Sequence, residues 1–367
     1  VKALEILSSE VEALWIPRKI QKLSSEPTPI EFLREYVSRS VPCIIPYNQS
    51  ACVGLTLDDL IDLSGNSEVT VNVTPDGHGD CVRPVQVRDD GKLRTVNMFV
   101  QPEEQVMSLE EFRTKLRQSR KLSVWPEYSD TGKKNLINVT LETGDEAREF
   151  DQSSDEVTNK MTASSPPVYY YSRQNDCLRT ELQNIFDNSV LFPKTIPFAE
   201  EAFNTPLEAV NLWVGDERAV SSMHKDHYEN LFLVLSGEKV FTICPPSDMA
   251  FLYENDFDCS RFHCKDNHEW VVRVDNLDPS DNESREKSVG QRVKWIEPDV
   301  TEPTDFNDKK RYPLLHNAHP IEVRVKEGEM LYLPSLWFHR VTQSCETVGI
   351  NYWFDMRFDD PKWCYFH

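Results

Sequence analysis

The stretch HKDHYENLFLVLSGEKVFTIC, His224–Cys244, joins a polar cluster to two apolar runs that a short glycine-containing turn separates. Its runs NLFLVL and VFTIC are rich in aromatic and β-branched residues, which favours strands over helices. A second unit of the same kind is IEVRVKEGEMLYLP, Ile321–Pro334, and VNLWVG, WFHRV and VGINYWF add further short strands. Two tight hairpins among strands of this length predict a sandwich or barrel, and a double-sheet jelly roll is its closed form.

The first third of the chain has the pattern of mixed helices and strands. In PTPIEFLREYV, Thr28 is the expected N-cap of a helix, with Pro29 at its first position and Glu31 completing a capping box. Further along, VQVRDDGKLRTVNMFV predicts a hairpin with Asp-Gly at its tip, and SLEEFRTKL predicts a second helix capped by Ser108. The apolar face of the first helix is expected to contain Ile30, Leu33 and Val37.

Polar residues dominate the stretch from Glu127 to Pro167, in which acids outnumber bases and large apolar side chains are few. Such a segment buries too little apolar surface to order itself, so we expect an inserted mobile loop. The segment from Asp275 to Lys310 has a similar composition. The expected organisation is one compact unit with three regions: an N-terminal α/β region at 1–126 that packs on the core, a polar acidic insertion at 127–167, and the core at 168–367.

A candidate metal site begins with His224 and Asp226, which are two residues apart. On a strand, residues at this spacing project from the same face. His339, in PSLWFHRV, is the candidate third ligand, because its strand is expected to return to the same sheet. Two histidines and one carboxylate form the facial triad of non-haem Fe(II) oxygenases, which leaves positions for O₂ and a chelating cosubstrate. A solvated turn with a stray histidine fits the same residues, so both interpretations stay open at this point.

Lys239 adds a cation to this picture. It follows the turn SGEK on the return strand, one strand over from the expected metal. A lysine there suits the distal carboxylate of 2-oxoglutarate, and nearby hydroxyl groups would complete a carboxylate pocket. The alternative interpretation is an ordinary charge at a turn.

Taken together, HKDHYENLFLVLSGEKVFTICPPSD, GEMLYLPSLWFHRV and VGINYWFDM resemble the JmjC hydroxylases of the 2-oxoglutarate oxygenase superfamily. The motifs PTP with EFLREYV, PCII, VNVTPDG and EAVNLWVG resemble the lysyl hydroxylase branch of that family, in the same order along the chain. The resemblance extends from about Thr28 to Phe366, apart from the two polar segments. It implies a mainly β fold with flanking helices (α+β), built on the double-stranded β-helix, or jelly roll, of a cupin-like JmjC core.

The resemblance also assigns roles to residues. It implies that Lys239 pairs with the side carboxylate of 2-oxoglutarate and that Tyr170, in VYYYSRQND, is the pocket tyrosine. Ser221 stands where relatives usually have threonine, so it keeps the hydroxyl group and lacks the methyl group. Asn230 and Asn351 correspond to amides near the cosubstrate and the metal. The implied iron ligands, which are also the catalytic residues, are His224, Asp226 and His339.

The implied activity is hydroxylation of a lysyl residue on carbon, with Fe(II), 2-oxoglutarate and O₂. The implied substrate is a translation-linked GTPase of the developmentally regulated GTP-binding class. A histone N-methyl-lysine demethylase is an alternative, although the sequence has no reader domain, zinc-ligand cluster or basic nucleosome-binding stretch. A peptidase acting on basic tails is a second alternative, without a HExxH motif or a nucleophile constellation in the sequence. A non-enzymatic cupin-like binding protein is a third, and the intact His, Asp, His and Lys set argues against it.

Net charge and cysteine content indicate which classes of partner and which compartment to expect. The net charge is −21, which argues against binding to nucleic acid or anionic membrane and fits a basic, lysine-bearing protein or peptide. No apolar stretch is long enough to span a membrane. Nine scattered cysteines without a CxxC pair favour a reducing compartment, so we expect the cytoplasm, with the nucleus as a second location. Relatives usually continue into helices that help to form a homodimer, whereas this sequence stops at His367, which argues against one.

Overall fold

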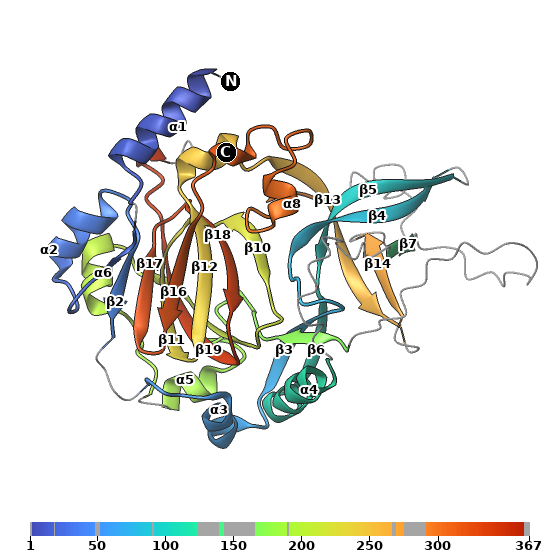
Figure 1. Cartoon of the computed structure of the whole chain (residues 1–367). Coiled ribbons are helices and arrows are strands. Elements are labelled where there is room, and N and C mark those ends of the chain that lie inside the picture. Colours follow the sequence, from blue (N-terminus) through green and yellow to red (C-terminus); the bar gives the residue numbers. More distant parts are fainter. Residues whose placement is uncertain are drawn as a thin grey trace, which may run out of the picture.

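Two facing sheets form the core of this computed structural model (Figure 1), which confirms the predicted jelly roll. The major sheet has the order β1-β2-β17-β11-β19-β9, and the minor sheet has the order β10-β18-β12-β16. The major-sheet strands are β1 (Gln21–Lys22), β2 (Cys43–Pro46), β17 (Glu329–Leu333), β11 (Tyr228–Ser236), β19 (Thr347–Asp355) and β9 (Leu207–Gly215). Those of the minor sheet are β10 (Ser221–Lys225), β18 (Phe338–Gln343), β12 (Glu238–Cys244) and β16 (Ile321–Lys326).

The structure describes most of the chain. The described residues are 2–17, 19–47, 52–89, 92–123, 139–142, 166–188, 191–265, 269–274 and 291–362. Most of the polar insertion predicted at 127–167 therefore lies outside the described residues, as does 275–290 of the second polar segment. Within the insertion, Val139–Glu142 forms strand β7.

The two tight turns of the sequence connect the sheets to each other. Strand β11 pairs with β17 and β19, whereas β12 pairs with β16 and β18, so the turn at Gly237 leads from the major to the minor sheet. The turn at Gly328 leads back from β16 to β17. The predicted hairpins are therefore wrong. Two apolar strands joined by a tight turn can bury their side chains as well in facing sheets as in a hairpin. Here the ring of Phe232 packs edge-on against that of Phe241, with ring centroids 5.3 Å apart.

The major sheet is apolar on both of its faces. Leu331 and Leu333 of β17 face the minor sheet, while Met330 and Tyr332 belong to a second core cluster on the outer face. The helices that flank the core are α2 (Pro29–Phe32), which continues as a π-helical turn at Leu33–Val37, α3 (Leu57–Ser64), α5 (Gln183–Asn188) and α6 (Pro197–Phe203). Burial on both faces explains why these strands read as nearly continuous apolar runs.

Helix α2 begins as predicted and buries a different face. Thr28 caps it and forms the expected capping box with Glu31. The aromatic rings of Phe32 and Tyr36 are buried, however, whereas Ile30 is 60% exposed and Leu33 is also exposed. Burying an aromatic ring removes more apolar surface from water than burying a branched aliphatic chain does. The predicted apolar face is therefore wrong, although Val37 does pack against the core.

A second lobe, on the right of Figure 1, is built from two distant parts of the chain. Its larger sheet has the order β14-β7-β4-β5-β13-β15, and β3 lies between β6 and β8 in a smaller sheet. The β4–β5 hairpin and the Ser108 cap of α4 are confirmed. The elements are β3 (Glu68–Thr74), β4 (Cys81–Asp89), β5 (Lys92–Gln101), β6 (Glu103–Ser108), α4 (Leu109–Leu122), β8 (Val168–Tyr170), β13 (Glu254–Cys264), β14 (Trp270–Val274) and β15 (Arg292–Ile296).

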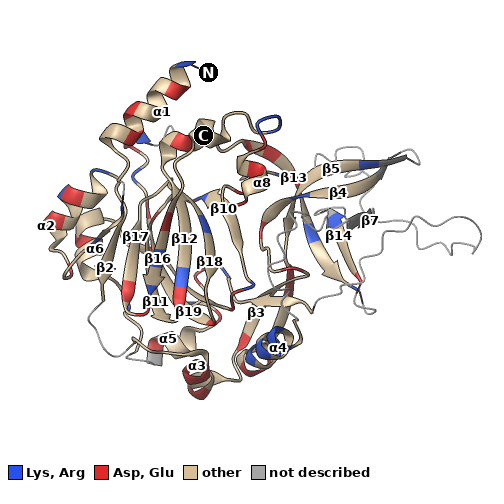
Figure 2. Ribbon diagram, viewed as in Figure 1, with Lys and Arg blue, Asp and Glu red and all other residues tan. Residues whose placement is uncertain are grey.

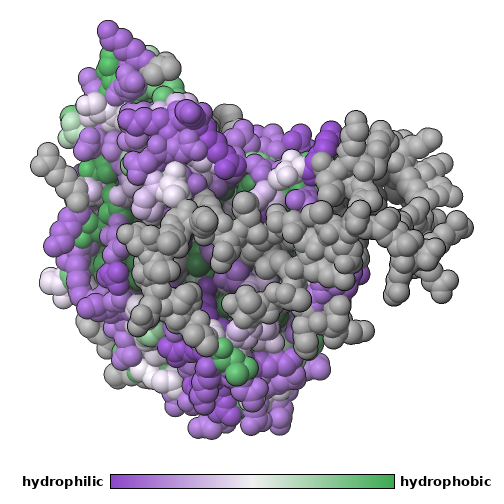
Figure 3. Space-filling model, turned by 45° about the vertical axis from the view of Figure 1, so that its right-hand side comes forward, coloured by the Kyte–Doolittle hydropathy of each residue, from purple (hydrophilic) through white to green (hydrophobic). Residues whose placement is uncertain are grey.

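Charged residues form ion pairs where the two lobes meet, and they cover much of the surface. Lys and Arg gather on α4 (Figure 2), where Arg117 pairs with Asp58 and with Glu346 of the β18–β19 turn. The face shown in Figure 3 is mainly hydrophilic, with small hydrophobic patches. No helix among the described residues is both long and apolar enough to cross a membrane.

Helix α1 (Lys2–Leu14) is attached to the core through a polar cluster next to the short helices at Pro246–Ala250 and Leu315–Asn317. The Ser8 hydroxyl donates to the carbonyl oxygen of Asn317 at 3.1 Å and lies 3.3 Å from His319 Nε2. The other ring nitrogen of His319 lies 2.8 Å from the buried Asp248 carboxylate. A short helix α8 (Pro303–Phe306) precedes this region.

Gly215, the last residue of β9, generates the first prediction. A Cβ there would lie 2.5 Å from Cδ2 of the buried Tyr170 ring. Gly215→Ala should therefore displace this ring and lower the free energy of unfolding by about 1–3 kcal/mol, measured by urea denaturation. Gly79→Ala is the matched control, because its Cβ would find its nearest neighbour at 3.5 Å. Equal stability of the two variants would contradict the tight packing of Tyr170 against β9.

Candidate metal centre and cosubstrate pocket

Strands β10 and β18 pair so that His224 lies directly opposite His339. Asp226 follows the last residue of β10, and its carbonyl oxygen accepts a hydrogen bond from the Leu336 N–H at 2.8 Å. One potential ligand atom from each of the three side chains lies within 4.8 Å of the others. The pairing of two strands that are more than a hundred residues apart thus brings the three predicted ligands together.

The two imidazole rings are oriented by their own strands. His224 Nδ1 lies 2.7 Å from the carbonyl oxygen of Ser222, and His339 Nδ1 lies 3.0 Å from that of Trp337. A carbonyl oxygen only accepts, so each Nδ1 carries the proton and each Nε2 has a free lone pair. These Nε2 atoms point to Asp226 Oδ2, at 3.9 Å from His224 and 3.5 Å from His339.

The protonation states suit a cation. Burial lowers the pKa of His224 to about 4, and repulsion from His339 adds to this effect, so the ring is neutral at pH 7. Burial acts to raise the pKa of Asp226, but its close contacts with His339 and His224 outweigh burial and lower that pKa to about 2. Two imidazoles and one carboxylate are a donor set that fits Fe(II).

Trp295 supports this centre and was missed in the sequence. Its ring stacks on that of His224, with centroids 5.4 Å apart and an interplanar angle of 3°. Its Nε1–H donates to the Ser222 hydroxyl at 2.8 Å. Trp295 lies on β15, within the second polar segment, whose composition concealed a strand that reaches the active-site region.

Lys239 is a fully buried cation on β12, the neighbour of β18. Its ammonium donates to the hydroxyl of Tyr170 at 2.9 Å and to the side-chain oxygen of Gln343. Among the residues that the structure describes, no carboxylate forms an ion pair with it, and burial lowers its pKa to about 7. A buried ammonium without an anionic partner is costly, so this site fits the carboxylate of a bound ligand.

Gln343 was also missed in the sequence. It lies opposite Lys239 in the β12–β18 pairing and is buried. Its amide N–H groups donate to the carbonyl oxygens of Asp216 and Ala219, which leaves its side-chain oxygen turned to Lys239. Only this register identifies the residue, since nothing in the local sequence SCETV or RVTQ marks a ligand pocket.

The remaining predicted pocket residues divide into two groups. Ser221 and Tyr170 line the cavity, and burial raises the pKa of Tyr170, an effect that a hydrogen bond with Ser221 only partly offsets. Asn230 and Asn351 lie behind it. The Asn351 amide donates to Asn230 at 3.3 Å and accepts from the indole of Trp213, which lines the cavity, at 2.9 Å.

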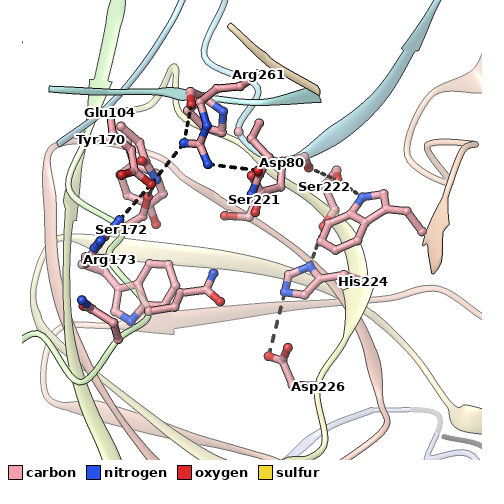
Figure 4. A pocket seen from close by; sticks show the side chains of 18 of the residues that line it. Asp80, Glu104, Tyr170, Ser172, Arg173, Ser221, Ser222, His224, Asp226 and Arg261 are labelled. Carbon is pink, nitrogen blue, oxygen red and sulfur yellow. Dashed lines mark hydrogen bonds and ion pairs between the residues drawn. The ribbon is translucent and has the colours of Figure 1, made fainter. Parts of the chain in front are cut away.

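A cavity of about 380 Å³ lies in front of these residues (Figure 4). Its lining comes from both lobes: β10 contributes His224, and β13 of the second lobe contributes Arg261. The figure shows Asp226 and His224 at one end and the charged side chains of Arg173 and Arg261 toward the other. A cavity of this size holds a small cosubstrate and a substrate side chain together.

Comparison with known proteins gives a consistent result. Residues 29–360 match a family model described as a cupin-like domain. JmjC domain-containing protein E of Dictyostelium discoideum is 36% identical over 96% of this chain and 88% of its own length. Lysine-specific demethylase JMJ32 of Arabidopsis thaliana is 32% identical over 100% of this chain and 90% of its own. The human bifunctional peptidase and (3S)-lysyl hydroxylase JMJD7 is 31% identical over 99% of this chain and 95% of its own.

These matches cover the two sheets of the jelly roll and the strands that carry His224, Asp226 and His339. The family implies Fe(II) and 2-oxoglutarate as cofactors, and the three side chains form a group able to hold the metal. The chain belongs to the JmjC family of cupin-like proteins, a family of 2-oxoglutarate-dependent oxygenases.

Proposed function

We propose that this protein is an Fe(II)- and 2-oxoglutarate-dependent hydroxylase that oxidises a lysyl side chain of a protein on carbon. The observation that carries the oxygenase part is the pairing of an oriented His224–Asp226–His339 group with the buried, anion-free Lys239 next to it. A metal site alone would serve many functions. A metal site beside a cation suited to a dicarboxylate favours a keto-acid cosubstrate.

The chemistry that the bound iron, cosubstrate and O₂ supply is oxidation of a C–H bond, coupled to decarboxylation of 2-oxoglutarate to succinate. The protein orients its ligands through two strand carbonyl oxygens, so no reorganisation is needed when the metal enters. Lys239 and Tyr170 bind the distal carboxylate and fix the direction of the cosubstrate, while the side-chain oxygen of Gln343 accepts from Lys239 and holds the ammonium in place. Trp295 and Trp213 form apolar walls that exclude water from the reacting carbon.

The lysyl substrate is supported by two observations. One relative across nearly the whole chain is named as a (3S)-lysyl hydroxylase. The net charge of −21 favours a basic partner. A lysine-bearing segment of a translation-linked GTPase of the developmentally regulated GTP-binding class is the substrate we propose to test first.

Demethylation of N-methyl-lysine is the second candidate, because another relative of similar identity is named as a lysine-specific demethylase. Both reactions would use the same metal site and a lysine side chain. They differ in the atom that must approach the metal: a carbon of the side-chain stem for hydroxylation, and the N-methyl carbon for demethylation.

One cluster could suggest a peptidase. Ser8, His319 and Asp248 lie next to one another and have the residue types of a hydrolase triad. The Ser8 hydroxyl, however, donates to the carbonyl oxygen of Asn317, and Ser8 is buried on a helix. A nucleophile must be accessible to a substrate and give its proton to the histidine. This cluster is therefore better explained as the attachment of α1.

The substrate assay is the first test of this function. The GTPase segment is incubated with the protein, Fe(II), 2-oxoglutarate and O₂, and the peptide mass is measured. A gain of one oxygen on lysine is expected. Loss of a methyl group from a methylated peptide, without any gain of oxygen, would instead identify a demethylase, and a shorter chain would identify a peptidase.

The metal ligands give the next prediction. Mn(II), used as a substitute for Fe(II), should raise the melting temperature of the wild type, because a ligand that binds only the folded state stabilises it. Asp226→Ala and His339→Ala should lose this shift and all hydroxylation. His316→Ala is the control, because His316 is an exposed histidine outside the cluster. An unchanged Mn(II) shift in His339→Ala would exclude that residue as a ligand.

Lys239 gives a prediction for the cosubstrate. Lys239→Met should weaken 2-oxoglutarate binding to the Mn(II)-loaded protein roughly tenfold to a hundredfold, because a buried charge-assisted hydrogen bond contributes about 1.5–3 kcal/mol. Calorimetric titration measures this. Lys326→Met is the matched control, since Lys326 is exposed on the adjacent strand β16.

The same residue sets the pH dependence of binding. Its pKa of about 7 means that Lys239 is charged below pH 7 and loses its charge above it. The dissociation constant for 2-oxoglutarate should therefore be lowest below pH 7 and rise toward about tenfold per pH unit above it, while Lys239→Met shows no such rise. A wild-type dissociation constant that stays constant from pH 6 to 9 would contradict this role.

A further inference from the structure

The pocket contains an acidic side chain that neither the metal centre nor the cosubstrate site uses. Asp80 precedes β4 and lines the cavity beside Ser221, Ser222 and His224 (Figure 4). Its main chain is held against β10: the Ser222 hydroxyl donates to the Asp80 carbonyl oxygen at 2.5 Å, and the Gly79 N–H donates to the carbonyl oxygen of Val220 at 2.9 Å. The carboxylate thus stands on a fixed piece of backbone near the metal ligands.

The backbone before Asp80 packs tightly against the segment before β10. Gly77 has a φ of +90°, and a Cβ there would lie 1.9 Å from the carbonyl oxygen of Arg218. Val220 donates back to the carbonyl oxygen of Gly77 at 2.8 Å, so the two segments are joined on both sides of His78. A group that binds a ligand selectively needs this kind of support, because a loosely held side chain loses specificity.

The cationic side chains that line the cavity form ion pairs, whereas the Asp80 carboxylate forms none with the residues that the structure describes. Arg173 and Arg261 both contact Glu104, at 2.8 and 3.1 Å, and Lys225 pairs with Glu254 at 2.9 Å. Among the described residues, no side chain forms an ion pair or a hydrogen bond with the Asp80 carboxylate. Burial raises its pKa to about 6, and the nearby charge of Arg261 only partly offsets this effect. The pocket therefore holds a carboxylate with unused capacity for a cation.

Aromatic side chains line the same cavity as this carboxylate. The rings of Trp295, Trp213 and Tyr170 line the same space. A ligand with an apolar stem and a cationic end matches this combination of aromatic walls and a carboxylate. A lysine side chain has that form, with four methylene groups between its backbone and its ammonium.

We propose that Asp80 binds the ε-ammonium of the substrate lysine and so selects an unmodified, charged lysine for this active site. The inference rests on the proposed function for the choice of lysine as substrate. Binding of the ammonium at Asp80 would occupy the charged end of the side chain, which leaves a carbon of the stem free to face the metal ligands. A neutral or bulkier end group lacks this attachment. Asp80 is thus a specificity-determining residue that takes no part in metal or 2-oxoglutarate binding.

The test is a binding experiment without turnover. The Mn(II)- and 2-oxoglutarate-loaded protein is titrated with three versions of one peptide, the GTPase segment above, carrying lysine, norleucine or Nε-acetyl-lysine at the target position. The wild type should bind the lysine peptide at least about tenfold more tightly than the two neutral ones. Asp80→Asn should lose this preference while keeping wild-type affinity for Mn(II) and 2-oxoglutarate, which also shows that the variant is folded.

Asp256→Asn is the matched control, since it removes the same charge from β13 at a position that does not line the cavity, and it should keep the preference. Equal binding of the three peptides by the wild type would overturn the proposal without any variant. A preference that persists in Asp80→Asn would overturn it as well. Failure of the proposed function is separate: the wild type would then keep its preference for lysine, while aerobic incubation with Fe(II) adds no oxygen to the peptide.

Discussion

The pairing of β10 with β18 is the interaction on which the active site depends. It sets His224 opposite His339, and the loop before β18 hydrogen-bonds to the main chain at Asp226. Because each histidine donates from Nδ1 to a carbonyl oxygen two residues before it, strand geometry alone decides which nitrogen faces the metal. A shift of one residue in this register would turn one of the two rings to the opposite face of the sheet.

The same minor sheet carries Lys239, the candidate cosubstrate residue. Strand β12 lies between β18 and β16, and its register sets Lys239 against Gln343, four residues along β18 from His339. Gly215 leaves room for the Tyr170 ring, which reaches Lys239 from the second lobe side. Metal ligands and carboxylate-binding groups are therefore spaced by strand geometry, which is more rigid than a loop and suits a cosubstrate of fixed length.

The second lobe contributes the residues on which the proposed selectivity for a substrate rests. Trp295 stacks on His224 from β15, and the segment before β4 carries Asp80 to the edge of β10. Both parts are distant in sequence from the core strands. A jelly roll alone would hold a metal and a small acid, whereas the added sheets enclose a cavity with aromatic walls and an acidic group. Shared folds acquire different functions through such additions.

The sequence predicted the fold class from its strand-forming runs, and it suggested His224 and Asp226 from their two-residue spacing. The resemblance of longer motifs to the JmjC family added support for His339 and Lys239, and the structure brings the three candidate ligands together. Residues that act only through long-range pairing, such as Gln343 and Trp295, carry no local signal. The two hairpins expected at Gly237 and Gly328 were wrong for the same reason, since a strand–turn–strand pattern does not record whether the strands pair or lie in facing sheets. The apolar face of α2 was decided by which side chains, Phe32 and Tyr36, found partners in the core. Composition and spacing thus determined what elements and chemical groups this protein has, and only tertiary packing decided which of them meet, because burial and strand register depend on residues far apart in the chain.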